Sequence, residues 1–532
     1  MDTTTAALNE SGGSARNDSP SWRPVGIGAL AGLVAGLLLT LLQALARLWL
    51  GVAPPSELIG DRIAPLLPVE QFLSLLGFFG GYDQLKQVGI AGPTLGQLAL
   101  AVVLGMLYAR LAVRSGGTRR ATRTLIVTVA VLFVVLIAAL WPVLATSHSG
   151  LSPSPSRWVT ILVLAVTLAL FTAAVVLTVR WVHGAPQKNE PPGAASSVTR
   201  RAVLAGGVGA GLAIATGGVG TVLYRQATFS YDGMQLNGPG ITPITPNESF
   251  YVVTKNVIDP KVRASVWRLS IGGAVARPMT YGFDDLRGMA SVTQEATLTC
   301  ISNAIGGGLQ SNAMWVGVPM RDLISEAGPE AGVVEVLLRG VDNFTDTFAI
   351  EKAMEPTTLV AYQMNGEPLP ERHGFPARVI VPGLFGEKNV KWVTRIDLVT
   401  EETKGFYEQQ GWGPSFVVPT VSRFTEPGFD RPLTAGAPVT LRGTAFAGNR
   451  GVSGVEVSVD DGAAWQPAQL EYSGSPLAWV LWRYEWRPDR PGEYPLLVRA
   501  TDGAGAPQIA EQRSSVPEGA TGYHRVMARV EA

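Results

Sequence analysis

Five long apolar stretches in the first half of the chain constrain its fold more than any other sequence feature. Four are long enough to cross a bilayer as helices, and they run approximately over residues 25–49, 88–111, 125–145 and 158–182. A fifth, over residues 202–224, is richer in Gly and Ala, which suits close helix packing or a signal-like segment. We therefore expect an all-α transmembrane region, followed by an outer half with another composition.

Basic residues indicate how these helices are oriented. Five arginines crowd the connection after the second stretch, namely Arg110, Arg114, Arg119, Arg120 and Arg123. The connection Ser147–Ser156 carries no Lys or Arg. The positive-inside rule therefore predicts a cytoplasmic arginine loop and an outer Ser/Pro loop, and the fifth helix carries the rest of the chain outward. The shorter apolar run Leu66–Phe79 contains Pro68 and Glu70, so we expect it to be interfacial or re-entrant.

The resulting division has six parts. We expect a disordered tail over residues 1–24, a membrane region with four helices over 25–183, a linker over 184–200, and a fifth transmembrane helix over 201–225. Two outer domains follow, over residues 234–405 and 414–532. At the end of the linker, Thr199–Leu204 resembles a twin-arginine export signal, although two membrane-flanking arginines explain it equally well.

The two outer domains have different patterns. In residues 234–405, short β-like runs such as Val333–Arg339 and Trp392–Val399 alternate with Gly/Pro turns and helical pieces such as Pro319–Ala327, which favours α+β. In residues 414–532, several short strands alternate with period two, which is typical of an immunoglobulin-like β-sandwich. With 42 basic and 42 acidic residues the formal net charge is zero, so nothing suggests a nucleic-acid binder.

Cys300 is the single cysteine of the sequence, within Thr299-Cys300-Ile301-Ser302-Asn303. One cysteine excludes an intramolecular disulfide, a Cys-only zinc or iron–sulfur site, and a Cys-x-x-Cys-His haem attachment. The remaining roles are a buried apolar thiol, a nucleophile, or one thiolate ligand to a soft metal that something else largely holds.

Three segments together resemble the molybdopterin domain of the sulfite oxidase and eukaryotic nitrate reductase family. They are the Cys300 segment, His373–Gly383 and Gly386–Trp392. The Cys300 segment is most similar to the bacterial, sulfite-oxidase-like branch, and Val457–Trp465 resembles the family's dimerisation domain. The resemblance covers about residues 233–532 and implies a molybdenum–molybdopterin cofactor, an oxidoreductase activity and a homodimer.

The resemblance also implies roles for individual residues. Cys300 would be the protein ligand of the metal and the catalytic residue, and Asn303 would bind the cofactor. The basic residues of the matching segments would hold the cofactor and its phosphate: His373, Arg378, Lys388 and Lys391. Lys255 and Asn256 match an entry strand to the pterin pocket. Each basic residue alone is more often a solvated surface charge, and Gly306–Gly308 is either a close backbone approach or a plain turn.

The sequence departs from the family at two points. The family carries an arginine of its anion pocket five positions after the ligand cysteine, and this chain has Ile305 there. That leaves the substrate open. Family members often carry a haem domain, but the four histidines here do not predict one, so we expect a separate electron acceptor, a cytochrome or a quinone.

Two functions from different classes follow. The first is a multi-pass cell-membrane oxidoreductase with its catalytic domains on the extracytoplasmic face, which performs two-electron oxygen-atom transfer on a small molecule. The alternative is a membrane-tethered binding or assembly protein with a degenerate molybdopterin domain, motivated by Ile305. A cysteine-nucleophile hydrolase would need His373 as its base, a residue that the cofactor explains better.

Overall fold

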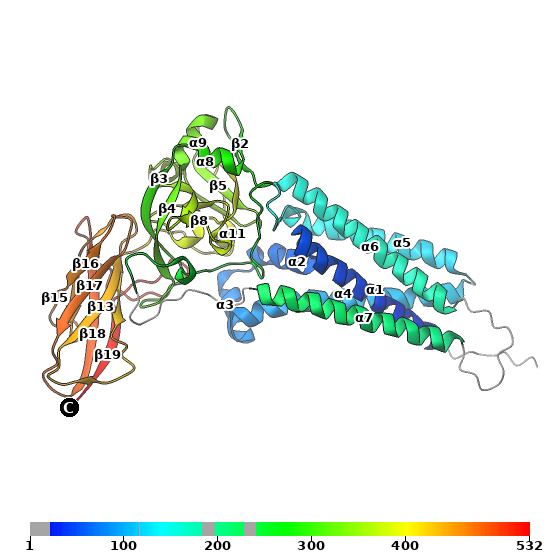
Figure 1. Ribbon diagram of the computed structural model, residues 1–532, viewed down its shortest axis with the longest axis horizontal. Helices are drawn as coiled ribbons and strands as arrows, with labels where there is room; N and C mark the ends of the chain where they lie inside the picture. The colour runs from blue at the N-terminus through cyan, green and yellow to red at the C-terminus, as the bar shows by residue number, and fades with distance from the viewer. Residues whose placement is uncertain (1–21, 116, 184–196, 228–240) are drawn as a thin grey trace, which may run out of the picture. The chain divides into compact units, whose positions relative to one another are not determined.

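The computed structural model describes residues 22–115, 117–183, 197–227 and 241–532 (Figure 1). The chain divides into two compact units. The first holds the residues up to 42 with residues 94–135 and 165–218, and the second holds residues 43–93, 136–164 and 219–532. Residues 1–21 of the predicted tail and most of the predicted linker lie outside the described residues, while residues 22–24, which we expected to end the tail, begin a long apolar helix. Residues 197–200, which we expected to end the linker, instead form the first turn of a helix, since nothing in Ser-Val-Thr-Arg breaks one.

Every apolar stretch predicted to be a long helix is one. The bounds are α1 (Trp22–Leu50), α4 (Tyr82–Arg114), α5 (Thr118–Leu140), α6 (Pro153–His183) and α7 (Ser197–Gln226). Among the described residues, five helices are long and apolar enough to cross a membrane. The run predicted to be interfacial forms the 11-residue helix α3 (Val69–Phe79), which is too short for a bilayer. Membrane crossing itself stays a prediction.

Within the first unit, α1 and α4 approach closely because their facing residues are small. A Cβ atom on Gly28 would collide with the carbonyl oxygen of Gly105, and one on Gly105 would collide with that of Gly28. Buried alanines continue the contact, including Ala31, Ala35 and Ala101. Small residues at such an interface allow backbone-to-backbone packing, so a larger side chain at either glycine would separate the two helices.

Two sheets build residues 269–399 of the second unit. One has the order β2-β1-β10-β5-β6, with β1 and β10 parallel, and consists of β1 (Leu269–Gly273), β2 (Met279–Tyr281), β5 (Glu335–Gly340), β6 (Thr345–Ala349) and β10 (Val393–Val399). The other has the order β3-β4-β7-β8, with β9 paired to β7, and consists of β3 (Val292–Thr299), β4 (Gln310–Pro319), β7 (Leu359–Met364), β8 (Glu367–Pro368) and β9 (Arg378–Ile380). With the short helices α8 (Phe283–Gly288), α9 (Met320–Ala327), α10 (Ile350–Ala353) and α11 (Phe406–Gln409), this part is α+β, as predicted.

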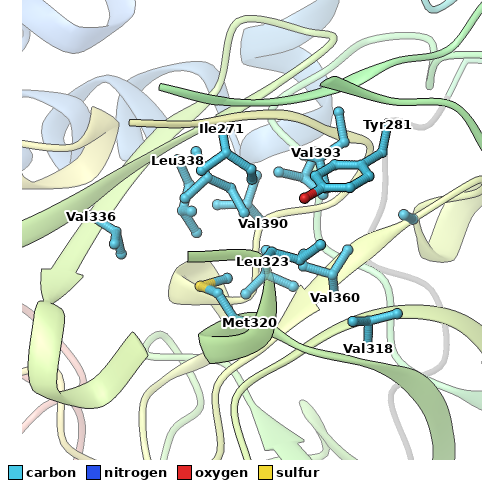
Figure 2. Packing of buried hydrophobic residues seen from close by; sticks show 14 of the residues in the cluster. Ile271, Tyr281, Val318, Met320, Leu323, Val336, Leu338, Val360, Val390 and Val393 are labelled. Atoms are coloured by element: carbon cyan, nitrogen blue, oxygen red, sulfur yellow. The ribbon is translucent and has the colours of Figure 1, made fainter. Parts of the chain in front are cut away.

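The amphipathic helix α9 closes the core of this part. Its buried residues recur at helical spacing and are Met320, Leu323, Ile324 and Ala327. Figure 2 shows Met320 and Leu323 near Val336 and Leu338 of β5, within one buried cluster. Fully burying such side chains stabilises the fold by about 1.5–3 kcal/mol each, which fixes the strands that lead to the site.

Two further sheets share a core in residues 421–531. One is ordered β11-β13-β17-β16, from β11 (Val421–Glu426), β13 (Val439–Phe446), β16 (Gln469–Ser473) and β17 (Val480–Trp486). The other is ordered β12-β19-β18-β14-β15, from β12 (Leu433–Thr434), β14 (Val452–Ser458), β15 (Gln466–Pro467), β18 (Gly492–Asp502) and β19 (His524–Glu531). Both sheets contribute to one buried cluster that includes Trp482 and Leu496. The immunoglobulin-like assignment stays a prediction.

Two connections between the long helices also belong to the second unit, and they contact its outer residues. The first contains α2 (Pro55–Ile63), the 3₁₀ turn η1 (Ala64–Leu66) and α3, and it runs into the start of α4. The second follows the turn η2 (Trp141–Val143), where Ser147 N–H donates to the carbonyl of Val341 at 2.8 Å. We call residues 55–93 the membrane-side segment.

Candidate functional site

A cavity of about 510 Å³ lies within the second unit. Its wall includes Cys300 at the end of β3, the turn Phe250–Val257, and parts of the segment from Arg372 to Trp392. The membrane-side segment lines another part of the wall, and so do Tyr407 and Trp412. Residues that lie up to about 350 positions apart therefore meet around one space, which is large enough for a cofactor-sized ligand.

Cys300 lies where β3 turns back toward β4. Its N–H donates to the carbonyl of Leu309 at 3.0 Å, and its Sγ atom lies 3.0 Å from the Oγ atom of Ser302. Burial, followed by the carboxylate of Glu387, raises the pKa of the Cys300 thiol to about 11. Without an added positive charge the group is therefore a thiol at neutral pH, which disfavours a nucleophilic role and leaves a metal as the source of a thiolate.

Asn303 shapes the Cys300 loop. Its Oδ1 atom accepts a hydrogen bond from the Leu309 N–H at 2.9 Å, and a Cβ atom on Gly307 would meet the same oxygen at 2.5 Å. Asn303 lines a second, smaller cavity and not the large one. The glycines after Asn303 thus form a tight turn, one of the two interpretations that the sequence left open.

Arg378 and Lys391 bring two cations to the large cavity, of which Arg378 is buried and Lys391 is partly buried. The guanidinium of Arg378 donates to the carbonyls of His373 at 3.2 Å and Asn389 at 3.1 Å, and burial lowers its pKa to about 10, so it stays charged. Its Nε atom is buried without a hydrogen-bond partner among the described residues. The ammonium of Lys391 donates to the carbonyls of Val253 at 3.3 Å and Arg372 at 3.2 Å.

His373 lies in the same wall but carries no charge. Its Nε2–H donates to the carbonyl of Asn247 at 2.9 Å, which leaves Nδ1 as an acceptor. Burial lowers the pKa of His373 to about 3, with Arg378 and Lys391 lowering it further against that hydrogen bond. His373 is therefore able to accept a hydrogen bond from a ligand but does not supply a cation, which we had not anticipated.

Lys255 and Asn256 line the cavity through contacts with other protein groups. Lys255 Nζ lies 2.7 Å from Asp61 Oδ1, and Asn256 Nδ2 donates to Asp342 Oδ2 at 2.8 Å. Burial opposes the charge of Lys255, but the carboxylates of Asp61 and Asp342 raise its pKa above the ordinary value. Both residues are thus placed at the wall, with their polar groups directed to acids.

The structure does not bring Lys388 into this cavity. Its ammonium lies 2.6 Å from Asp346 Oδ1 and 3.1 Å from Glu408 Oε1, and it stacks on the ring of Phe416. Asp346, Glu408 and the aromatic face of Phe416 therefore surround the Lys388 ammonium and stabilise its charge. The sequence pattern could not separate Lys388 from Lys391, because both lie in one short basic segment.

Tyr251 and Glu387 lie at the cavity wall beside Cys300, and our residue assignments had included neither. A Cβ atom on Gly386 would meet the Tyr251 hydroxyl at 2.5 Å, so only glycine permits this approach. Both carboxyl oxygens of Glu387 are buried without a partner among the described residues. Burial, followed by Asp346, raises the pKa of Glu387 to about 8, so it is largely a neutral acid at pH 7. A carboxyl beside two lysines in the Gly386–Trp392 segment was the available signal.

A second cavity, of about 30 Å³, also reaches Cys300. Ile305 and Gln310 lie in its wall with Arg423 of β11. The Gln310 side chain is 3 % exposed, and its Nε2 atom has no hydrogen-bond partner among the described residues. Arg423 donates to the Gly307 carbonyl at 2.8 Å, and burial lowers its pKa to about 10. Donors therefore surround a space large enough for a few small atoms.

Two family models match the outer half of the chain. The oxidoreductase molybdopterin binding domain matches residues 256–407, and the Mo-co oxidoreductase dimerisation domain matches residues 416–531. Sulfite oxidase from Gallus gallus is 30% identical over 309 residues, which cover 49% of this chain and 67% of that protein. The chain belongs to the sulfite oxidase family of molybdopterin oxidoreductases.

Other relatives are similar over the same half. The mitochondrial sulfite oxidase of Mus musculus is 31% identical over 308 residues, which cover 49% of this chain and 56% of that protein. Nitrate reductase [NAD(P)H] of Hordeum vulgare is 30% identical over 323 residues, which cover 49% of this chain and 36% of that protein. The chain thus spans about half the length of the mammalian relative that it matches. The helical residues before the matched region have no counterpart in these family models.

The large cavity fits the cofactor of this family. A pterin phosphate needs cations and donors, and Arg378 offers a buried, partnerless Nε atom beside the ammonium of Lys391. The pterin ring needs both donors and acceptors, and neutral His373 supplies an acceptor at Nδ1. Cys300 supplies the soft ligand that molybdenum prefers. The residues present therefore match the chemical parts of the cofactor.

Proposed function

We propose that this chain is a membrane-anchored, molybdopterin-dependent oxidoreductase. The observation that carries the proposal is the meeting of Cys300, His373, Arg378 and Lys391 around one cavity of about 510 Å³. Each residue alone has a common structural explanation. A soft ligand, a neutral acceptor and two cations at one wall match a thiolate-ligated metal with a phosphate-bearing pterin.

When bound, the molybdenum–pterin group supplies two-electron oxygen-atom transfer and releases electrons one at a time. Cys300 holds the metal, while Arg378 and Lys391 hold the phosphate, the arginine through its planar fork and the lysine as a point charge. His373 orients the pterin by accepting a hydrogen bond at Nδ1. The Tyr251 phenol, whose pKa burial raises well above 10, stays protonated and donates beside Cys300. The same residues serve oxidation and reduction.

The small cavity is the proposed entrance for a small anionic substrate. Ile305 in its wall removes the arginine that the family carries at this position, but Arg423 brings a guanidinium to the same wall from β11. The partnerless Nε2 atom of Gln310 adds a donor. In a desolvated space such donors stabilise a localised negative charge. Substitution at position 305 therefore changes which residue supplies the cation.

The location of the catalytic part is proposed from charge and contacts together. The positive-inside rule assigns two connections, residues 51–82 and 144–152, to the outer face. Residues in both connections hydrogen-bond to the outer half: Val69 N–H donates to the Gln410 carbonyl at 2.7 Å, and Lys261 N–H donates to the His148 carbonyl at 3.0 Å. This agreement supports five spans and an extracytoplasmic active site. Thr199–Leu204 as a twin-arginine signal would fit export of a domain folded around a cofactor.

Electrons then leave to a separate acceptor, a cytochrome or a quinone. The match to a dimerisation domain supports a homodimer. The second candidate function is a membrane-tethered binding or assembly protein with a degenerate domain, which Ile305 favours.

Cofactor content of the full chain, made in a host that loads a control molybdoenzyme, separates the two functions. We expect about one molybdenum and one pterin per chain. In the Cys300→Ser variant we expect the absorption bands of the metal–thiolate to be lost and activity abolished, while the fold and the pterin are retained. A full chain that holds no molybdenum under these conditions would make the binding protein the better assignment.

A further inference from the structure

We infer that the membrane-side segment is part of the cofactor site, and that Lys86 at the start of α4 supplies a cation for the phosphate monoester of the pterin. This inference rests on the proposed function. It concerns a part of the chain that lies before both matched family domains.

Buried polar contacts fix the membrane-side segment against the outer residues. Lys255 pairs with Asp61 of α2 at 2.7 Å, and the two side chains are only 8% and 20% exposed. Two hydrogen bonds join the turn before α3 to Gln410: its Nε2 atom donates to the Ala64 carbonyl at 2.9 Å, and its carbonyl accepts from Val69 N–H at 2.7 Å. Because these contacts are buried and directional, they fix the position of the membrane-side segment relative to the outer residues.

Lys86 reaches from this segment into the turn that precedes the family domain. Its Nζ atom donates to the carbonyls of Thr254 at 3.0 Å and Asn256 at 2.7 Å, on either side of Lys255. The residue is 9% exposed and lines the large cavity. Two carbonyl contacts hold this amine at the wall, where it would carry its positive charge against a bound phosphate.

Lys86 joins cations that already line the same cavity, namely Arg372, Arg378 and Lys391. Burial lowers the pKa of Lys391 to about 8, and the charges of Arg378 and Arg372 lower it further against the pull of Asp259 and Asp342. Cations gathered in a desolvated space repel one another, and a dianion bound among them removes that cost. A phosphate monoester is a dianion of this kind near neutral pH.

The rest of the segment contributes apolar side chains to the cavity. They come from α2, from the turn after it, from α3 and from α4, and they are Ile59, Ile63, Leu67, Phe72, Leu75 and Leu85. An apolar wall excludes water, and in a drier space each cation–phosphate contact is stronger. The segment therefore supplies both a charge and the enclosure that makes this charge effective.

Cofactor retention by the full chain in detergent tests the inference. Lys86→Gln keeps a hydrogen-bond donor for the two carbonyls but removes the charge. We expect it to hold at least fivefold less pterin and molybdenum per chain after dialysis than the wild-type chain, and Lys86→Arg to restore most of the content. The matched control is Lys352→Gln, because Lys352 on α10 pairs with Glu355 and is absent from the cavity wall.

Apoprotein from a host that makes no pterin provides the folding control. If the Lys86→Gln apoprotein has the same melting temperature as the wild-type apoprotein, its lower pterin content comes from a lost ligand contact and not from a damaged fold. If Lys86→Gln apoprotein melts lower, inorganic phosphate decides: it should raise the melting temperature of wild-type and Lys86→Arg apoprotein more than that of Lys86→Gln. Equal retention, or equal phosphate shifts, in wild-type and Lys86→Gln chains would overturn the inference but leave the proposed function intact. A wild-type chain without pterin would overturn both.

Discussion

The ammonium of Lys255 lies 2.7 Å from a carboxylate oxygen of Asp61, a residue 194 positions earlier in the chain. This ion pair joins the turn before the family domain to helix α2. Both side chains are mostly removed from solvent. The pair therefore connects two segments, and no sequence motif indicates that they contact each other.

Breaking this pair from one side should destabilise the second unit. Asp61→Ala removes the hydrogen-bonded partner of the buried Lys255 ammonium and leaves only the more distant charges of Asp342 and Glu57, so we expect a loss of about 3 kcal/mol in the free energy of unfolding. Removing both charges in Asp61→Ala/Lys255→Met should recover much of that loss. Denaturant unfolding of the apoprotein, followed by tryptophan fluorescence, measures both. A double variant no more stable than the single one would show that the pair is not the origin of the effect.

Lys388 should matter for stability and not for the cofactor. Lys388→Met leaves the buried carboxylate of Asp346 without its partner at 2.6 Å, so we expect a loss of about 3 kcal/mol in the free energy of unfolding. The pterin content of the chain that does fold should equal that of the wild type. Lys391→Met is the matched comparison, because it lines the cavity and should lose pterin. Parallel loss of pterin in both variants would support the assignment made from sequence.

These two lysines show how far the sequence carried the prediction of the site. A distinctive cysteine and a basic segment were enough to predict that Cys300, Arg378 and Lys391 share a site, since these residues lie in motifs that are local in the chain, and the structure places all three at one cavity. Which lysine faces the cavity depends on Asp346 and Glu408, whose positions relative to Lys388 are set by packing. The neutral state of His373 likewise follows from its burial, which cannot be predicted from a sequence motif.

The same reasoning applies to the fold. Apolar length predicted each long helix, because a run that can span a bilayer has few other stable forms. The strand β4 was missed, since it is buried at nearly every position and does not alternate. Lys86 and Asp61 were missed for another reason: they lie in an apolar half that has no family pattern, and only tertiary structure brings them to the cavity.

His524 should make stability depend on pH below neutrality. Its Nδ1 accepts a hydrogen bond from Phe424 N–H at 3.0 Å, and burial, together with Arg423, lowers its pKa from 6.5 to about 4. The unfolded chain therefore binds the proton first as the pH falls. The contribution is fully present above pH 6.5 and is lost between pH 6.5 and about 4.

Because His524 is partly exposed, we expect a loss on the order of 2 kcal/mol over that range. His524→Gln keeps an acceptor for Phe424 but cannot titrate. The unfolding free energy of the wild type, measured relative to that of this variant, should therefore fall by about that amount as the pH falls from 7 to 4. Curves that stay parallel would contradict the assignment.

Arg423 should make the small cavity bind anions. Its guanidinium is buried yet charged, and it shares the cavity wall with Cys300 and with the partnerless amide of Gln310. An anion that binds the folded chain raises stability by about 2.7 kcal/mol at one hundred times its dissociation constant. Sulfate should therefore raise the melting temperature of the wild-type apoprotein more than that of Arg423→Gln. Sulfate also stabilises proteins without binding them, so the comparison needs Arg442→Gln, which removes a partly exposed arginine of β13 that is absent from the wall of the small cavity. We expect Arg442→Gln to respond to sulfate like the wild type. Arg423→Gln should lose the part of the melting-temperature shift that comes from specific binding. Equal shifts in all three chains would contradict the proposal that Arg423 replaces the arginine missing at position 305.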